Sequence, residues 1–544
     1  MLTGPAVEAS VRSIPEVVMR RPLYPVAAVL VAALGLSACG GGGDDAGSAS
    51  GDRTLVVDTS FQLTTSDPAR MFEPTGQIID HVIYETLYTF EGTDSTTPVP
   101  LLATDEEISE DGLTHTFTLR DDVTFSDGTP MTADDVVFSL NRVIQVKGNP
   151  SFLLDGVTVE KVDDTTVTLT TATPDPALPF KLTNPALGVV NSAAVTEAGG
   201  SDQEGAETAD TAEDALNGES QGSGPYVIES FDVQDQVVLT RNPEYWGEEP
   251  AYDRIVLRNT EASVQSVNVR SGDAQLVVDL SADQAAELGG GDVTVDSSPS
   301  ANVFFVYTNN DPAVSPITSN PDFQEAVRYG IDYSALVDLA GEGSSQTPGV
   351  IPTTFLGALD PSDAVERDTD RAEQALAASG ISDPTVTLSY PSEIQVNGID
   401  FGDLAAAVQA QLAEVGITVE LAPAPVQTAL EGYRAGTEEM GLWSWGPDYP
   451  DPSDYLVFTP GQLVGLRAGW AAGADPTLEA AATAVSSEFD DDARVDAYTT
   501  IQQQLNESGP FYPLIQPAQV LAYSSSLEGV AFNPSWTVDL ADIS

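Results

Sequence analysis

The first forty residues constrain this chain most, because they determine the compartment in which the rest of it must fold. Arg20 and Arg21 precede a short apolar run at 26–34, and small residues follow that run. This order is typical of a secretory signal peptide. The run is shorter than the about 20 apolar residues needed to span a membrane. We therefore expect residues 1–38 to be removed after export, with translation starting at Met1 or, if residues 1–18 are an over-long start, at Met19.

Cys39 follows this segment directly and is the only cysteine of the chain. The residues Leu36-Ser37-Ala38-Cys39 resemble the bacterial lipobox, whose cysteine is acylated before the peptide is cut in front of it. An ordinary signal peptide with an incidental cysteine is the alternative. A lone thiol in an exported protein calls for a special role, since disulfides need pairs. One acyl chain binds membranes only marginally, and the lipobox resemblance implies several on Cys39.

The residues after Cys39 have almost nothing to bury. Residues 40–51 read GGGGDDAGSASG, and such a stretch reaches about 20 Å as a flexible coil. We expect residues 39–53 to be a lipidated tether and the folded part to begin near Arg53. This places the protein on the outer face of the cytoplasmic membrane.

Length and charge limit the remaining possibilities. About 500 residues follow the expected cleavage point, too many for one compact core, so two or more domains are expected. The formal net charge is −64, and losing residues 1–38 makes it one unit more negative, because three arginines and two glutamates leave. Such a surface repels nucleic acid and anionic lipid. We therefore expect no nucleic-acid partner. We also expect the lipid on Cys39, and not the charge of the surface, to anchor the protein to the membrane.

Lysine is nearly absent, occurring only at Lys147, Lys161 and Lys181. An acidic, lysine-poor surface suits salty surroundings, where salt screens self-repulsion. An acidic, GC-rich bacterial genome produces the same composition. The sequence leaves both explanations open.

The apolar pattern predicts a mixture of strands and helices without strict alternation. Residues 115–119 alternate as a strand, and residues 157–170 read as a hairpin. Thr132 and the acids after it predict a helix start. Apolar residues at helical spacing over 404–415, ended by Gly416, predict a helix followed directly by a strand.

Residues 199–221 carry seven acidic residues and no basic one. We expect this segment to be a solvated loop or insertion without a ligand of its own. A metal site within it is a weaker alternative.

Catalysis has no positive support in the sequence. His81 and His115 are the only histidines, and there is no cysteine besides the one at the expected cleavage point. Zinc sites draw on clusters of these residues, and no phosphate-binding loop is present. The series Asp448, Asp451, Asp454 is interrupted by prolines and lacks the glycine of a calcium loop. We expect no enzyme activity, no metal and no cofactor, with an exported hydrolase as a distant alternative.

One block in the first third of the chain is far more specific. Residues 111–142 read DGLTHTFTLRDDVTFSDGTPMTADDVVFSLNR. Further blocks follow in a fixed order, at Ser66–Ala69, Tyr84–Leu87, Gly222–Tyr226, Arg241–Gly247, Ala326–Asp332 and Trp445–Pro452. The ordered series resembles the family 5 solute-binding proteins of ABC importers, which capture peptides, nickel chelates and related solutes. The resemblance covers residues 54–544.

Part of this series is expected to be scaffold. Residues 125–130 contain Asp-Gly and a following proline, which is turn chemistry. Asn242-Pro243 begins another turn, under which Tyr245 and Trp246 are expected to pack.

Residues 443–452, which read WSWGPDYPDP, differ from that scaffold. Prolines prevent a regular helix or central strand, and an irregular aromatic loop is a common place for binding groups. In peptide-binding family members, the aspartate of a W-x-x-D pattern pairs with the ligand's α-amino group, and that position here is Asp448. Trp443, Trp445 and Tyr449 could supply apolar or cation–π walls. The alternative is that Asp448 only caps a turn.

One departure from the family limits the ligand. Some dipeptide binders place an arginine for the ligand carboxylate before the helix at 402–415, whereas residues 390–398 contain none. A longer peptide or another amine-bearing solute therefore fits better than a short peptide held at both ends. A histidine-assisted nickel site is less attractive with two histidines in the chain.

The resemblance implies an α/β, two-lobed periplasmic-binding-protein-like fold of type II, in its large cluster C form. An added domain at 98–221, with the acidic loop 199–221, is expected beside lobe II at 309–513. Lobe I is then expected to combine residues 54–97, 222–308 and 514–544.

The same resemblance implies the partners. A monomer would close its lobes on a peptide and dock on a membrane permease, and a separate subunit of the complex would hydrolyse ATP. A family member for another solute, such as chelated nickel, an oligosaccharide or an opine-like amine, is the main alternative.

Overall fold

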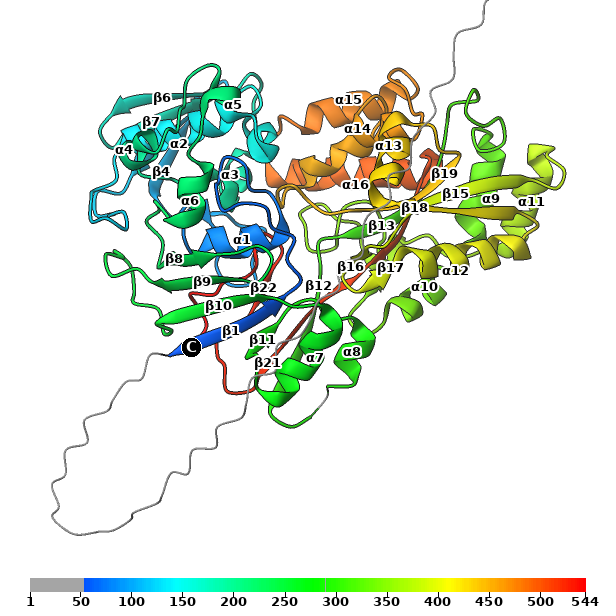
Figure 1. Ribbon diagram of the computed structural model, residues 1–544. Coiled ribbons are helices and arrows are strands. Elements are labelled where there is room, and N and C mark those ends of the chain that lie inside the picture. The colour runs from blue at the N-terminus through cyan, green and yellow to red at the C-terminus, as the bar shows by residue number, and fades with distance from the viewer. Residues whose placement is uncertain (1–52, 289) are drawn as a thin grey trace, which may run out of the picture. The chain divides into compact units, whose positions relative to one another are not determined.

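The computed structural model describes residues 53–288 and 290–544, in which three large β-sheets form (Figure 1). The expected signal peptide, Cys39 and all of the expected tether except Arg53 lie outside the described residues. Within the described part of the chain, no helix combines the length and the apolar character needed to cross a membrane.

The first sheet is mixed and draws its seven strands from distant parts of the chain. β1 (Thr54–Thr59) pairs in parallel with both β10 (Arg254–Asn259) and β11 (Leu276–Val277). The order across the sheet is β12 (Val293–Pro299), β21 (Ala518–Ser524), β11, β1, β10, β9 (Gln236–Arg241) and β8 (Tyr226–Phe231).

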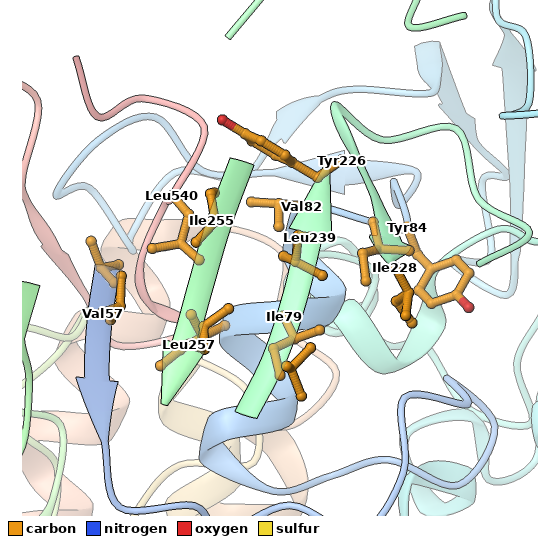
Figure 2. Packing of buried hydrophobic residues seen from close by; sticks show 14 of the residues in the cluster. Val57, Ile79, Val82, Tyr84, Tyr226, Ile228, Leu239, Ile255, Leu257 and Leu540 are labelled. Atoms are coloured by element: carbon orange, nitrogen blue, oxygen red, sulfur yellow. The ribbon is translucent and has the colours of Figure 1, made fainter. Parts of the chain in front are cut away.

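Different elements cover the two faces of this sheet. Successive strand residues point to opposite faces, so Val57 joins one apolar cluster and Val56 packs against another. On the first face, the side chains meet α1 (Pro74–His81) and C-terminal residues such as Leu540, as Figure 2 shows. α7 (Ala262–Ser271) packs on the second face. Each 100 Å² of apolar surface buried in this way stabilises the fold by about 2.5 kcal/mol.

The second sheet has six strands and carries helices on both faces. Its order is β14 (Ser345–Gln346), β20 (Phe511–Gln516), β13 (Val303–Thr308), β19 (Met440–Trp445), β15 (Thr385–Ser392) and β18 (Thr418–Pro425). β13 is buried along its whole length, with Phe304 and Phe305 in two different apolar clusters. The predicted helix and following strand are confirmed as α12 (Phe401–Glu414) and β18, with Gly416 between them at a φ of +89°.

The third sheet is antiparallel, in the order β4 (Ala103–Ile108), β5 (Thr114–Leu119), β7 (Thr166–Thr170) and β6 (Thr158–Asp163). It confirms the predicted strand and the predicted hairpin. α2 (Ala133–Val146) begins after Thr132, as predicted, and the N–H of Thr132 donates to Oδ2 of Asp135 over 2.9 Å. This contact satisfies a group at the helix end that has no partner within the helix.

The other elements are shorter or lie at the surface. The remaining helices are α3 (Leu178–Lys181), α4 (Ser192–Glu197), α5 (Ala206–Ala209), α6 (Glu213–Gly218), α8 (Ala282–Ala286), α9 (Pro321–Gly330), α10 (Tyr333–Ala340), α11 (Thr369–Ser379), α13 (Val426–Ala435), α14 (Leu463–Arg467), α15 (Pro476–Val485) and α16 (Asp491–Ser508). The 3₁₀ turns are η1 (Asn149–Leu154), η2 (Pro185–Leu187), η3 (Pro361–Asp363) and η4 (Pro452–Phe458). Two-stranded ribbons are formed by β2 (Tyr88–Thr89) with β3 (Val99–Pro100), β16 (Gln395–Val396) with β17 (Ile399–Asp400), and β22 (Phe532–Asn533) with β23 (Thr537–Val538).

Two chain segments cross side by side from the first sheet to the second. One leads from β12 to β13 through Ser300, and the other from β20 to β21 through Pro517. The N–H of Ser300 donates to the carbonyl of Pro517 over 2.9 Å, and Gln516 Nε2 donates to the carbonyl of Ser300 over 2.6 Å. The crossings are therefore tied together by hydrogen bonds.

The expected lobe boundaries fall at other positions than these crossings. The boundary at 308/309 assigned β13 to lobe I, and the boundary at 513/514 cuts β20. Both strands belong to the second sheet, because β13 pairs with β19 on one side and with β20 on the other. The change of sheet occurs at 300–302 and at 517.

The acidic segment 199–221 differs from the expected solvated loop. It contains α5 and α6, and Ala206, Ala212 and Leu216 are buried. Asp210 is 8% exposed and accepts hydrogen bonds from the guanidinium of Arg142, at 2.8 Å from Nε. The cause is tertiary, because the counter-charge comes from α2, far away in the sequence.

Candidate functional site

The candidate loop begins where β19 ends. Trp445 is the last strand residue, and the prolines at 447, 450 and 452 prevent the ladder from continuing. A Cβ at position 446 would lie 2.3 Å from Oδ1 of Asn302, so any residue larger than Gly446 would displace the side chain of Asn302. η4 starts after Asp451, whose Oδ1 accepts from the N–H of Ser453 over 2.9 Å.

Asp448 lies in the middle of this loop and is half-buried. Its N–H donates to Oδ2 of Asp454 over 3.3 Å, and its carbonyl accepts from Nδ2 of Asn184 over 3.3 Å. No ion pair within residues 53–288 and 290–544 includes its carboxylate, which burial leaves with a pKa raised from 3.8 to about 6. The capping residue of η4 is Asp451.

Asp454, on η4, lies beneath Asp448 and is 4% exposed. Its Oδ2 accepts from the indole N–H of Trp445 over 3.1 Å, as well as from the N–H of Asp448. Burial, followed by the charge of Asp448, raises the pKa of Asp454 well above its usual range. In the sequence, Asp454 belongs only to an acidic series that lacks the glycine of a calcium loop, and its place at this site was not predicted.

The three aromatic residues have different surroundings. Trp443 is 6% exposed, stacks on Tyr433 at a centroid distance of 4.5 Å and belongs to the apolar core behind the strand. Trp445 is half-buried and meets the ring of Phe458 edge-on at 5.9 Å. The structure therefore places Trp445 beside Asp448 and Trp443 inside the core.

Tyr449 reaches toward the third sheet. Its ring packs against the apolar cluster under that sheet, and the ammonium of Lys181 lies 5.1 Å from the ring centroid. Lys181 is also held by Asp175 at 2.6 Å. Together with the contact from Asn184, this gives the loop two attachments to the 98–221 region, which sequence reasoning did not foresee.

The turn that lacks the family's arginine lies close to the same loop. Nδ2 of Asn302 donates to Oδ1 of Asn397 over 2.7 Å, and Asn302 also touches Gly446. Asn397 has a φ of +50°, and its Nδ2 donates to Oε1 of Gln519 over 2.8 Å. The side-chain amides of Asn302 and Asn397 thus lie between the two crossing segments and the loop that holds Asp448.

Both histidines have structural partners. His115 is fully buried on the predicted sheet face, and its Nδ1 lies 2.6 Å from Oε1 of Glu106. His81 stacks on Trp536 at 3.8 Å and pairs with Asp539 at 3.1 Å. Within the described ranges, no group of three or more His, Cys, Asp or Glu residues is arranged to hold a metal ion.

Comparison with known proteins identifies a family whose sequence pattern this chain matches. The sequence pattern of the family described as "Bacterial extracellular solute-binding proteins, family 5 Middle" matches residues 97–462. The chain is 26% identical to the probable D,D-dipeptide-binding periplasmic protein DdpA of Escherichia coli, covering 88% of this chain and 92% of that protein. It is also 26% identical to di/tripeptide-binding protein 2 of Pseudomonas aeruginosa, over 90% of this chain and 94% of the relative.

Solved structures share the architecture. The substrate-binding protein CtaP of Listeria monocytogenes matches with a TM-score of 0.78 and 20% identity, covering 91% of this chain and 99% of that one. DppA of Helicobacter pylori, in complex with the peptide STSA, matches with a TM-score of 0.72 and 21% identity, over 90% and 97% of the two chains. These likenesses confirm the predicted two-lobed α/β fold.

Proposed function

Because the chain belongs to family 5 of the bacterial extracellular solute-binding proteins, we propose that it captures peptides outside the cell for an ABC importer. One observation carries the choice of ligand: the carboxylate of Asp448 is half-buried and has no cationic partner in the described chain. A partly buried carboxylate without a counter-charge raises the free energy of the protein. A ligand ammonium that pairs with Asp448 removes much of this cost, which favours binding.

In this proposal the α-amino group of the peptide pairs with Asp448. Trp445 and Tyr449 flank it and provide apolar or cation–π contact. Trp443 supports the end of β19 from the core side, which its stacking on Tyr433 favours. The amides at Asn302 and Asn397 suit the main chain of a longer peptide better than a terminal carboxylate.

Lobe closure would carry the signal to the membrane. We propose a hinge at the paired crossings near Ser300 and Pro517, with residues 98–221 as an added domain on lobe I and the second sheet in lobe II. Closure brings Asn184 and Lys181 onto the loop that holds Asp448. A ligand stabilises this state only to the extent that it prefers it to the open one. The closed monomer then docks on a permease whose partner subunit hydrolyses ATP, and itself catalyses nothing.

Cys39 would hold this receptor on the outer face of the cytoplasmic membrane through its lipid. A Cys39→Ala variant should leave the membrane fraction and appear in the soluble exported fraction of the producing cells. Retention on the membrane would contradict anchoring by Cys39.

A thermal-shift screen tests the ligand class. Peptides of graded length, the same peptides with an acetylated amino terminus, an opine and a nickel chelate are compared at equal concentration. A ligand at a hundred times its Kd stabilises the folded protein by about 2.7 kcal/mol. Free-amine peptides should raise the Tm, and Asp448→Ala should abolish the rise. Equal shifts with acetylated peptides would contradict the role of Asp448.

Another amine-bearing solute is the second candidate. The matching solved structures include MoaA of A. tumefaciens R10 in complex with mannopinic acid, with a TM-score of 0.72 and 23% identity over 91% of this chain and 99% of that one. The absence of arginine from 390–398 favours this class over a dipeptide clamped at both ends. A shift with the opine and none with any peptide would establish it.

A further inference from the structure

Two neighbouring carboxylates of the candidate site are buried to almost the same degree but differ in charge compensation. Asp451 is 0% exposed and Asp454 is 4% exposed. Asp451 pairs with Nη2 of Arg494 at 2.5 Å. Among residues 53–288 and 290–544, no lysine, arginine or histidine forms an ion pair with Asp454. Only Asp451 is therefore compensated as an ion.

The hydrogen bonds of Asp454 converge on one of its oxygens. Oδ2 accepts from the indole N–H of Trp445 at 3.1 Å and from the N–H of Asp448 at 3.3 Å. A protonated carboxyl group has one carbonyl oxygen that accepts and one hydroxyl oxygen that carries the proton. Two donors on one oxygen suit the neutral acid, with the proton on Oδ1.

The charges around Asp454 point the same way. The main-chain N–H of Asp448 is 3.3 Å from Oδ2 of Asp454, Asp451 is already matched by Arg494, and the ammonium of Lys181 is held by Asp175. Burial and the charge of Asp448 both raise the pKa of Asp454. When two carboxylates lie close together, the charge of one opposes ionisation of the other, and their protons leave in two separate steps.

We propose that Asp454 determines the charge specificity of this site: it stays a neutral acid beneath Asp448, so that the site presents one negative charge and accepts one cationic amine. The inference rests on the proposed binding of an amine at Asp448. It adds that the recognised end of the ligand is a monocation, paired by Asp448 alone. Asp454 is a positioning residue, because it holds the N–H of Asp448 and the indole of Trp445 without touching the ligand.

Infrared spectroscopy of the protein without ligand tests the protonation state directly. At about pH 7.5, the difference between wild type and Asp454→Asn should show the loss of one C=O stretching band of a protonated carboxyl group. Asp360→Asn is the matched control, because hydrogen bonds from Ser362 lower the pKa of that exposed carboxyl and it has no such band to lose. An unchanged band region in Asp454→Asn would overturn the proposal.

Binding measurements test whether Asp454 adds a charge to the site. With trialanine as the probe, Asp454→Asn should keep its Kd within about threefold at neutral pH, since the amide mimics the neutral acid. The acid midpoint of binding should stay within about 0.3 pH unit of the wild-type value, because a neutral acid is replaced by a neutral amide and no charge beside Asp448 is removed. A loss of tenfold or more at neutral pH, or a midpoint lower by about one pH unit, would show that Asp454 carries a charge of its own and would overturn the proposal. If trialanine does not bind, the proposed function is in question, and the infrared result still decides this inference.

Discussion

Two charge clusters in this molecule differ in whether their charges are compensated by other residues. Around Arg142, which is 1% exposed, the guanidinium contacts Asp67 at 2.5 Å and Asp210 at 2.8 Å, and Arg70 adds a second positive charge to both. Around Asp448, two carboxylates lie together with hydrogen-bond donors and no cation of the described chain.

This difference in charge compensation distinguishes a cluster that stabilises the fold from one that we propose binds a ligand. The Arg142 cluster has two positive and two negative groups, so its charges are satisfied before any ligand arrives. The Asp448 pair carries a charge that the protein leaves unmatched, and it lies in a loop rather than inside a domain. Desolvated charges are retained in proteins when something pairs with them. For the loop, we infer that the missing partner is the ligand.

The largest expected effect is a loss of stability when the cluster around Arg142 loses its positive charge. Arg142→Met leaves Asp67 and Asp210 buried without their main counter-charge, which should lower the free energy of unfolding by about 3–5 kcal/mol. Urea unfolding followed by circular dichroism measures it. Lys147→Met removes an exposed pair with Glu207, and its effect should stay below about 0.5 kcal/mol. Similar losses in the two variants would remove the distinction between satisfied and exposed pairs.

The next effect is on binding. Asp448→Asn keeps the shape of the loop and removes its unmatched charge, so the affinity for a free-amine peptide should fall at least tenfold, or about 1.4 kcal/mol. Calorimetric titration measures the Kd. The unfolding free energy should not fall, because no native ion pair is broken. A loss of stability without a loss of affinity would make Asp448 a structural residue.

The pH dependence of binding follows from the pKa of Asp448, raised to about 6 by burial. Below that pH the carboxyl group takes up a proton and loses its attraction for an ammonium, so affinity should fall about tenfold near pH 5. A terminal amine itself loses its proton above about pH 8, so binding should weaken there too. Affinity that stays flat between about pH 5 and 7 would contradict the ion pair.

Stability without ligand should follow the opposite trend. Between the ordinary pKa of 3.8 and the raised value of about 6, the folded state binds more protons than the unfolded state. The contribution of Asp448 to stability therefore falls as pH rises through this window. Asp448→Asn should gain about 1–2 kcal/mol over wild type near pH 7 and nothing near pH 3.5. Unfolding curves at the two pH values test this sign.

The smallest effect concerns closure. Asn184→Ala removes one hydrogen bond to the carbonyl of Asp448, which should weaken binding by about two- to fivefold. The measurement is the Kd for the same peptide, with Thr208→Ala as a surface control in the same part of the chain. An effect as large as that of Asp448→Asn would mean that Asn184 contacts the ligand.

Much of the local structure could be predicted from neighbouring residues. The strand around His115, the hairpin at 157–170, the helix start at Thr132 and the helix ending at Gly416 were all confirmed, since alternation, capping and glycine act over a few residues. The prolines and aromatics of residues 443–452 predicted an irregular loop, and the family resemblance, through its W-x-x-D pattern, singled out Asp448 within it. The solvated loop expected at 199–221 was wrong at Asp210, whose counter-charge is 68 residues away.

The sequence by itself determined the kind of protein: ordered motifs over most of the chain and a proline-broken aromatic loop that carries Asp448. Only the tertiary structure decided which charges are matched. It placed Arg142 against Asp210, Arg494 against Asp451, and no cation of the described chain against Asp448 and Asp454. The physical reason is that compensation depends on distances of a few ångströms between residues far apart in the chain, whereas local patterns register only nearest neighbours.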